Sequence, residues 1–328
     1  MRLVVGVHRR GPLVSLNVKP QRARAHEGKM ASAAGSIDSD LVRRLVASQF
    51  PQWADLPVRP VARSGWDNRT FHLGDGMSVR LPSAQAYSGQ VAVEQRWLPF
   101  LAPSLPLRIP EPLAMGTPSH GYPWNWSVYR WIPGEASSQE SINSLPDFSR
   151  QLAAFLVALQ QIDTASGPQP GPTNFYRGGN LSVYDDQAKS AIAALRGRIN
   201  TSAADRMWSA ALSTCWERPP VWVHGDIAIG NLLVNRGSLA AVIDFGQLAV
   251  GDPACDLAIA WTLLQGDNRE VFRKTLGLDS STWQRGRAWA LWKAMIVAAG
   301  MTATNANEGV LCWQVIDEVF AEHAQTEA

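Results

Sequence analysis

Two aspartates and one asparagine lie in a short stretch of the chain, and their types suit the chemistry of phosphate groups. Asp226 follows the apolar run 221–223, Asn231 comes five residues later, and Asp244 ends a second apolar run over 239–243. Carboxylate and amide oxygens are the ligands that Mg²⁺ prefers in proteins. Phosphoryl transfer needs positioning and charge neutralisation more than covalent help. The pattern therefore predicts phosphoryl transfer, with two short strands delivering these side chains to one edge.

The three side chains divide into two roles. A carboxylate must orient the acceptor hydroxyl and accept its proton late in the reaction, and we assign Asp226 to this role. Asn231 and Asp244 are assigned to the metal. The alternative is a pair of strands whose turns contain Asp, Asn and Gly because these are the usual turn residues. Several linked motifs at compatible spacing argue against that alternative.

The spacing also resembles a known family. The motif H-G-D-x-x-x-x-N over 224–231, followed thirteen residues after its asparagine by D-F-G, resembles the catalytic and metal loops of protein-kinase-like enzymes. Gly225 stands where protein kinases have arginine, and G-D-P-x-x-D follows over 251–256. These two features resemble the aminoglycoside phosphotransferase and choline kinase family, whose substrates are small molecules. The resemblance implies that His224 and Asp256 support the catalytic loop, with Asp256 bracing its backbone.

The same resemblance implies a nucleotide site that precedes this stretch. The sequence S-G-W-D-N over 64–68 takes the place of the loop that covers the phosphates. Arg80 stands where kinases carry a phosphate-binding lysine, and a guanidinium can hold phosphate oxygens in a bidentate manner. Glu94 matches the helix glutamate that pairs with this cation. The predicted nucleotide-binding residues are Ser64, Asn68, Arg80, Glu94, Arg130 and Ile132.

The stretch 126–135 resembles the hinge between two kinase lobes, so the backbone of Arg130 to Ile132 would face the purine. Tyr129 would then lie near the gatekeeper position, where bulk can disfavour adenine relative to guanine. This alignment leaves both ATP and GTP open as the phosphoryl donor, with Mg²⁺ as the cofactor.

The fold prediction is α+β: a protein-kinase-like, two-lobed chain with a small antiparallel N-lobe and a larger, mainly helical C-lobe. Residues 1–35 are predicted to be a basic, disordered extension, 36–130 the N-lobe and 131–328 the C-lobe. Apolar residues that alternate along the chain predict strands, and apolar residues at helical spacing predict helices. Strands are expected over 58–62, 69–73, 77–81, 112–115 and 127–131, and helices over 38–48, 84–98, 148–159, 254–265, 282–299 and 308–323.

Charge is distributed unevenly along the chain. Its net charge is +2, but the first 30 residues hold seven lysines or arginines and one glutamate. This surplus of six leaves −4 for the remaining residues. A mildly acidic body argues against a nucleic-acid partner and is compatible with a cationic substrate. The basic start is either a mobile arm or a segment that precedes a biological start at Met30.

Other features narrow the class of protein. The three cysteines lack the spacing of a zinc site or a disulfide framework. No apolar run reaches the roughly 18 residues of a membrane span, which predicts a cytoplasmic chain without a membrane partner. Oligomeric state cannot be predicted.

The predicted acceptor is a small, cationic molecule: an aminoglycoside-like antibiotic that receives phosphate on a hydroxyl. The alternatives are a macrolide, a choline-like or sugar metabolite, and a catalytically dead kinase fold used for binding. Acidic residues in late helices could attract ammonium groups, although helices normally carry such charges on solvated faces. These residues are Asp267, Glu270, Asp279, Glu308, Asp317 and Glu318. Late tryptophans could line a pocket, but core packing explains most of them.

Overall fold

The structure is a computed structural model that describes residues 37–327 except 63, 64, 66, 165 and 303–305. The predicted extension over 1–35 and the predicted nucleotide-binding residue Ser64 lie outside the described residues. Within the described part, no helix is both long and apolar enough to cross a membrane.

A five-stranded antiparallel sheet forms the first half of the described chain. Its strand order is β1-β2-β3-β5-β4, and a turn at Gly74, with φ of +60°, begins the β2–β3 connection. Glycine suits this turn because it adopts positive φ without steric cost. The strands are β1 (Val58–Pro60), β2 (Asn68–Leu73), β3 (Met77–Pro82), β4 (Pro112–Gly116) and β5 (Trp126–Arg130).

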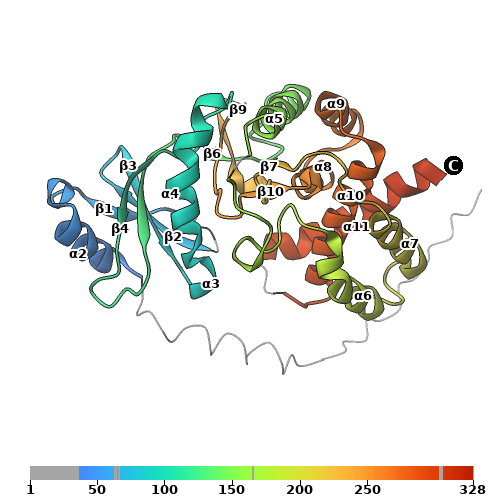
Figure 1. Cartoon of the computed structure of the whole chain (residues 1–328), viewed down its shortest axis with the longest axis horizontal. Coiled ribbons are helices and arrows are strands. Elements are labelled where there is room, and N and C mark those ends of the chain that lie inside the picture. Colours follow the sequence, from blue (N-terminus) through green and yellow to red (C-terminus); the bar gives the residue numbers. More distant parts are fainter. Residues whose placement is uncertain (1–36, 63–64, 66, 165, 303–305, 328) are drawn as a thin grey trace, which may run out of the picture. The chain divides into compact units, whose positions relative to one another are not determined.

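Helices cover both faces of this sheet (Figure 1). On one side, α2 (Ser39–Gln49) contributes Leu41, Val42, Leu45 and Val46 to an apolar core shared with Val79 and Leu81 of β3. On the other side lies α4 (Gln90–Leu101), which follows the short helix α3 (Gln85–Ser88). The sequence predicts one helix over 84–98, but the structure divides it at Gly89 because Gly89 caps α3 and begins α4. Helix α4 presents Trp97 and Leu98 to the core of the second half.

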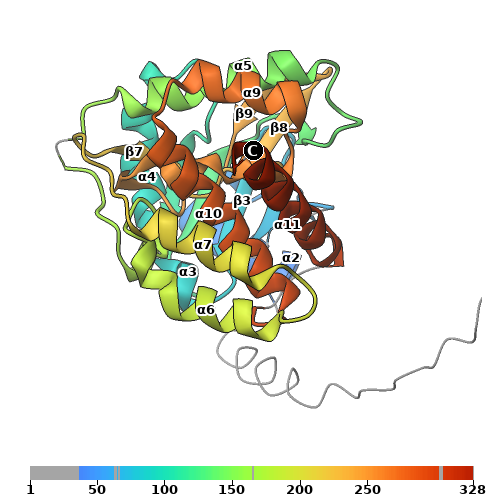
Figure 2. The same ribbon diagram turned by 90° about the vertical axis from the view of Figure 1, so that its right-hand side faces the viewer.

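The second half is mainly helical and has one large apolar core. Helices α5 and α9 lie side by side in both views, and α10 contacts α6, α7 and α11 (Figures 1 and 2). The helices are α5 (Leu145–Gln160), α6 (Asp185–Ala194), α7 (Thr201–Leu212), α8 (Ile259–Thr262), α9 (Gly266–Leu276), α10 (Ser280–Ala298) and α11 (Ala306–Glu327).

Two small sheets in this half carry the residues singled out by their chemistry. Strand β7 (Val221–Val223) pairs antiparallel with β10 (Ala249–Gly251), and β8 (Leu232–Asn235) pairs with β9 (Ser238–Val242) and with β6 (Glu135–Ala136). Asp226 thus follows β7, Asn231 precedes β8, and Asp244 follows β9. Strands β7 and β9 lie in separate sheets rather than at one shared edge as predicted, and hydrogen bonds of Asn231 and His224 bring the three chain positions together.

The α+β fold, with an antiparallel sheet followed by a helical region, is confirmed. One predicted element differs in kind. The helix expected over 254–265 is a 3₁₀ segment over Pro253–Ala258 followed by the single turn of α8. Asp252 caps this segment by accepting from the Ala254 N–H at 3.0 Å, and Pro253 begins it.

Candidate active site

Asp226 is held by groups of its own loop. The Asn231 amide nitrogen donates to the Asp226 backbone oxygen at 2.9 Å and to Asp226 Oδ2 at 3.1 Å. The Asp226 N–H donates to His224 Nδ1 at 3.2 Å, so the other ring nitrogen, Nε2, carries the hydrogen that is donated to the Ile243 carbonyl at 3.1 Å. His224 is fully buried. Its ring therefore connects the loop that carries Asp226 to the strand end that carries Asp244.

Asp256 contacts the backbone of the same loop. Its Oδ2 accepts from the His224 N–H at 2.8 Å, and its Oδ1 accepts from the Gly225 N–H at 2.7 Å. Burial raises the pKa of Asp256, while His224 and the two backbone donors act in the opposite direction. A carboxylate is suited to this position because each of its oxygens accepts one of two adjacent backbone donors.

Asp244 faces a charged network from the sheet half. Arg80 Nη2 lies 3.1 Å from Asp244 Oδ1, and Arg80 Nη1 lies 3.4 Å from Glu94 Oε1. Although burial opposes the charged form, the Asp244 and Glu94 carboxylates raise the pKa of Arg80 above its ordinary value. The pairing of Arg80 with Glu94 that the sequence predicts is thus a contact in the structure.

The network also joins the two halves of the described chain. Glu94 Oε1 accepts from the Phe245 N–H at 2.9 Å, across 151 residues of sequence, and Glu94 Oε2 accepts from the Tyr129 hydroxyl. The Tyr129 side chain therefore points to Glu94. Because Phe245 follows Asp244 directly, the position of α4 and the position of the D-F-G segment are coupled.

Sequence reasoning missed Asp67, a further carboxylate near Asp244. Burial, and then the nearby charge of Asp244, raise the pKa of Asp67 from its ordinary value of 3.8 to about 6. Gln90 Nε2 donates to Asp67 Oδ2 at 3.4 Å, and the Gln90 side chain lies against Gly246. Asp67 stands directly before Asn68, which is buried at the start of β2. The signal was available, since Asp67 belongs to the motif assigned to phosphate binding.

The donor set at Asn231 and Asp244 fits Mg²⁺. Both hydrogen bonds of the Asn231 side chain are donated by its nitrogen, so within the described chain its amide oxygen remains available as a ligand. Asp244 adds a carboxylate whose side chain is 25% exposed. No group of three His, Cys, Asp or Glu side chains arranged for a metal occurs among the described residues. Two protein ligands match the way Mg²⁺ is usually held, with phosphates and water completing its shell.

The hinge residues Arg130 to Pro133 differ in their backbone hydrogen bonds. The Arg130 N–H donates to the Glu111 carbonyl at 2.9 Å, and the Trp131 N–H donates to the Gly76 carbonyl at 2.8 Å. Pro133 has no N–H. Of the Arg130, Trp131 and Ile132 N–H groups, only that of Ile132 has no hydrogen-bond partner among the described residues. The Arg130 side chain pairs with exposed Glu111, which leaves only its backbone near the hinge.

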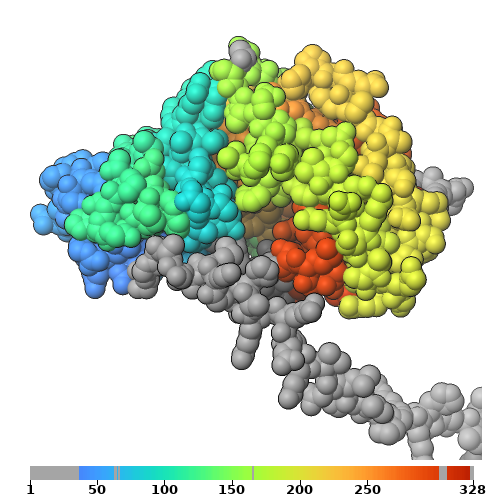
Figure 3. Space-filling view, turned by 60° about the horizontal axis from the view of Figure 1, so that its bottom comes forward, coloured from blue at the N-terminus to red at the C-terminus, as the bar shows by residue number. Residues whose placement is uncertain are grey.

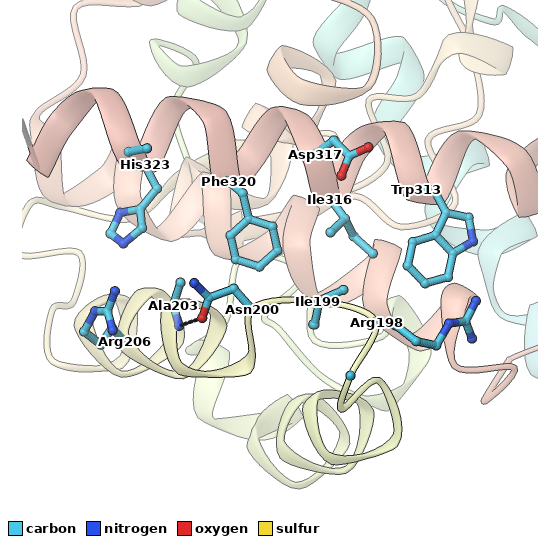
Figure 4. Close-up of a pocket in the computed structure, with 12 residues that line it drawn as sticks. Arg198, Ile199, Asn200, Ala203, Arg206, Trp313, Ile316, Asp317, Phe320 and His323 are labelled. Carbon is cyan, nitrogen blue, oxygen red and sulfur yellow. Dashed lines mark hydrogen bonds between the residues drawn. The ribbon is translucent and has the colours of Figure 1, made fainter. Parts of the chain in front are cut away.

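Three of the acidic residues considered for ammonium binding are paired with basic side chains. Asp279 caps α10 and pairs with Arg218, Glu270 pairs with Lys274, and Glu318 pairs with Arg269. Asp317 lines a groove of about 620 Å³ between α11 and the segment that begins α7 (Figure 4). None of the predicted catalytic, loop-supporting, nucleotide-binding or metal residues lines this groove.

The loop over 174–179 lies against the catalytic stretch. Gly225 has φ of +86°, and a Cβ built on it would overlap the Gln247 carbonyl and lie 3.0 Å from Arg177 Cβ and Cγ. The Asp252 N–H donates to the Gly178 carbonyl at 2.8 Å. Figure 3 shows this face of the molecule hollowed between the cyan region of α3 and α4 and the yellow-green segment that includes the loop.

Comparisons with known proteins agree with this geometry. The model of the family described as "Phosphotransferase enzyme family" matches residues 58–289. Two proteins from Escherichia coli, each named aminoglycoside 3'-phosphotransferase, are similar to parts of the chain. One is 35% identical over 63 residues, covering 19% of this chain and 23% of the relative. The other is 24% identical over 158 residues, covering 42% of this chain and 52% of the relative. The matches thus span about a quarter and about half of these relatives.

Solved structures share the fold. The GDP and kanamycin complex of APH(2")-IIia has a TM-score of 0.66 at 18% identity, and covers 86% of this chain and 99% of its own. Macrolide 2'-phosphotransferase MphH from Brachybacterium faecium has a TM-score of 0.56 at 20% identity, with coverage of 85% and 97%. The family match extends over most of the chain and includes the residues of the catalytic and metal loops. The chain therefore belongs to the phosphotransferase enzyme family.

Proposed function

We propose that this chain is a Mg²⁺-dependent phosphotransferase that moves the γ-phosphate of ATP or GTP to a hydroxyl of an aminoglycoside-like antibiotic. One observation carries the phosphotransferase part. Asp226 is fixed beside Asn231, while Asp244 contacts an Arg80 that is paired with Glu94. In this proposal Asp226 is the base, Asn231 and Asp244 are the two metal ligands, and Arg80 is the phosphate-binding cation. Phosphoryl transfer requires this set of groups.

In this proposal Asp226 Oδ accepts the proton of the acceptor hydroxyl as its oxygen bonds to the γ-phosphorus. The bond from that phosphorus to the β-phosphate oxygen breaks, and a nucleoside diphosphate leaves. Asn231 holds the carboxylate through its bond to Oδ2, so the base is oriented before substrate arrives. Mg²⁺, when bound to Asn231 and Asp244, supplies charge neutralisation on the phosphates. The Arg80 guanidinium, which contacts Asp244, binds phosphate oxygens.

The names of the relatives support the aminoglycoside acceptor, and so does the negative charge of the chain after its first 30 residues. A polycation bound through that charge is screened by salt. Its Michaelis constant should therefore increase with ionic strength while the turnover number changes little.

A macrolide is the second candidate, and one observation favours it. Three of the acidic residues considered for ammonium binding are paired with arginine or lysine, which neutralises their charge. A weakly charged acceptor depends less on free carboxylates than a polycation does.

The test begins with Mg-nucleotide binding by thermal shift and continues with panels of aminoglycosides, macrolides and metabolic alcohols. Each product is analysed by mass spectrometry for one added phosphoryl group. A phosphorylated aminoglycoside with a salt-sensitive Michaelis constant supports the full proposal. A product from another panel alone overturns the acceptor and keeps the reaction. Nucleotide binding without turnover on any panel overturns the reaction in favour of a binding protein.

A further inference from the structure

The loop over 174–179 has an unusual backbone for residues that carry side chains. Phe175 and Tyr176 follow each other with φ of 52° and 54°, and Gly178 has φ of 74°. Consecutive left-handed residues other than glycine are rare because the Cβ approaches the following carbonyl. Such conformations persist only where the surroundings determine them, and they concentrate at functional sites. The loop is therefore a candidate for a role that requires a fixed geometry.

Several hydrogen bonds hold the loop in this shape. The Asn174 amide nitrogen donates to the Gln169 carbonyl at 3.0 Å and to the Leu248 carbonyl at 3.4 Å, and Asn174 is 4% exposed. The Tyr176 N–H donates to the Gly171 carbonyl at 2.8 Å. The Tyr184 hydroxyl donates to the Phe175 carbonyl. Both ends of the left-handed pair are thus anchored.

Glycines let the loop lie directly on the catalytic stretch. A Cβ built on Gly251 would overlap the Gly178 carbonyl oxygen. A Cβ built on Gly225 would lie 3.0 Å from the Cβ and Cγ of Arg177. The stem of Arg177 therefore occupies the space beside Gly225, the residue directly before Asp226.

The head of Arg177 joins this loop to two further elements. Its Nε donates to Gln247 Oε1 at 2.9 Å, and Gln247 directly follows the D-F-G segment. The guanidinium carbon lies 5.0 Å from the ring centre of Trp289 and 5.9 Å from that of Trp292 on α10. Within the described residues no carboxylate lies at ion-pair distance from Arg177. The Arg177 guanidinium is therefore contacted by two aromatic rings and one side-chain amide, all of them neutral groups.

We propose that Arg177 is a positioning residue for phosphoryl transfer. It fills the space that Gly225 leaves open and fixes the loop of Asp226 against the segment that follows Asp244. Filling alone would need only an apolar stem, whereas this side chain also binds Gln247 and lies against two tryptophans. The inference rests on the proposed phosphotransferase function.

The test separates positioning from acceptor contact by using water as the acceptor. Hydrolysis of Mg-ATP and Mg-GTP without an acceptor depends on the placement of Asp226 but on no acceptor contact. For Arg177→Ala we expect the turnover number of this hydrolysis to decrease about 10- to 100-fold, with the nucleotide Michaelis constant changed by less than about twofold. Arg177→Lys, which keeps the stem and the charge, should recover part of the loss.

Arg198→Ala is the matched control. Arg198 also lies over a tryptophan of the helical half, 4.3 Å from the centre of the Trp313 ring, but on the groove between α7 and α11 (Figure 4). It contacts none of the predicted site residues, so hydrolysis should remain unchanged. Unchanged hydrolysis in Arg177→Ala, with only the acceptor Michaelis constant raised, would overturn the proposal and make Arg177 an acceptor contact.

A readout without turnover keeps the two proposals distinguishable. Hydrogen exchange of the amides over 224–231 should be faster in Arg177→Ala than in the wild type and in Arg198→Ala, because the loop loses one of its supports. If the wild type turns over no nucleotide at all, the proposed function fails, and the exchange measurement still decides the positioning role. Equal exchange in all three proteins would overturn it. Melting of each variant confirms that it is folded, and Arg177→Lys carries the test if Arg177→Ala does not fold.

Discussion

Two sides of the candidate site are built in opposite ways. The donor side, formed by Arg80, Glu94 and Asp244, joins the two halves of the chain through charged side chains and the Phe245 N–H. On the loop side, formed by the 174–179 loop and the glycines at 225 and 251, the backbone of the loop approaches the backbone of the catalytic stretch closely because these glycines have no side chain. The donor side depends on which charges are present. The loop side depends on which side chains are missing, so the two sides should respond differently to substitution.

The largest effect is expected at the base itself. Asp226→Asn should decrease turnover by about 10²- to 10⁴-fold because the variant cannot accept the acceptor's proton. Mg-nucleotide affinity should stay within about twofold, since Asp226 is not assigned to the metal. Single-turnover kinetics and calorimetric titration measure the two quantities. Turnover close to that of the wild type would show that another group is the base.

A change on the donor side should affect binding as well as chemistry. Asp244→Ala removes a proposed metal ligand and leaves the buried Arg80 without one of its two carboxylates. We expect Mg-nucleotide affinity to weaken by at least about tenfold, which corresponds to about 1.4 kcal/mol, together with a loss of turnover. Asp226→Asn is the natural control in the same titration. Wild-type affinity in Asp244→Ala would remove Asp244 from the metal site.

On the loop side, a single added methyl group should destabilise the fold. In Gly225→Ala the Cβ meets the Gln247 carbonyl at a φ of +86°, so we expect the free energy of unfolding to decrease by about 1–3 kcal/mol. Gly230→Ala is the matched control in the same loop, because nothing lies within 4 Å of its Cβ position. That variant should stay within about 0.5 kcal/mol of the wild type. Denaturant unfolding compares them, and equal stabilities would contradict the close approach.

The smallest effect concerns Asp67 and pH. Its pKa of about 6 in the folded chain exceeds its ordinary value of 3.8, so the folded state binds this proton more tightly than the unfolded state does. Its contribution to stability is therefore present below about pH 4 and is lost as the pH rises towards 6. Asp67→Asn should remove this dependence. The melting temperature of the variant relative to the wild type should increase across that window, in buffer without Mg²⁺ or nucleotide. A constant difference would contradict the raised pKa.

Most of the donor side could be predicted because its residues are charged and stand in sequence motifs. Arg80, Glu94 and Asp244 each carry a charge in a motif, and their contacts follow from the strands and the helix that hold them. Tyr129 shows the limit of this reasoning. Its place in the strand was predictable, but only the packed structure shows that its hydroxyl donates to Glu94.

The loop side could not be predicted in the same way. Gly178 and Gly251 are 73 positions apart, and nothing local indicates that their backbones meet. The helices α6 and α7 were also absent from the prediction, although Asn200 accepts from the Ala203 N–H as an N-cap. Their apolar positions are largely alanines, including Ala188, Ala191, Ala203 and Ala204, and small side chains give a weak periodic signal.

The close approach of Gly178 to Gly251 also constrains how this protein can diverge. In a saturation library selected for activity on any acceptor, positions 178, 225 and 251 should accept glycine alone, because the loop and the catalytic stretch share that space. Position 230 should accept other residues in the same library, because nothing lies within 4 Å of its Cβ position. New acceptor preferences would then arise by exchanging side chains around an unchanged backbone, and a lineage that lost one of these glycines would have to rebuild the whole loop to recover.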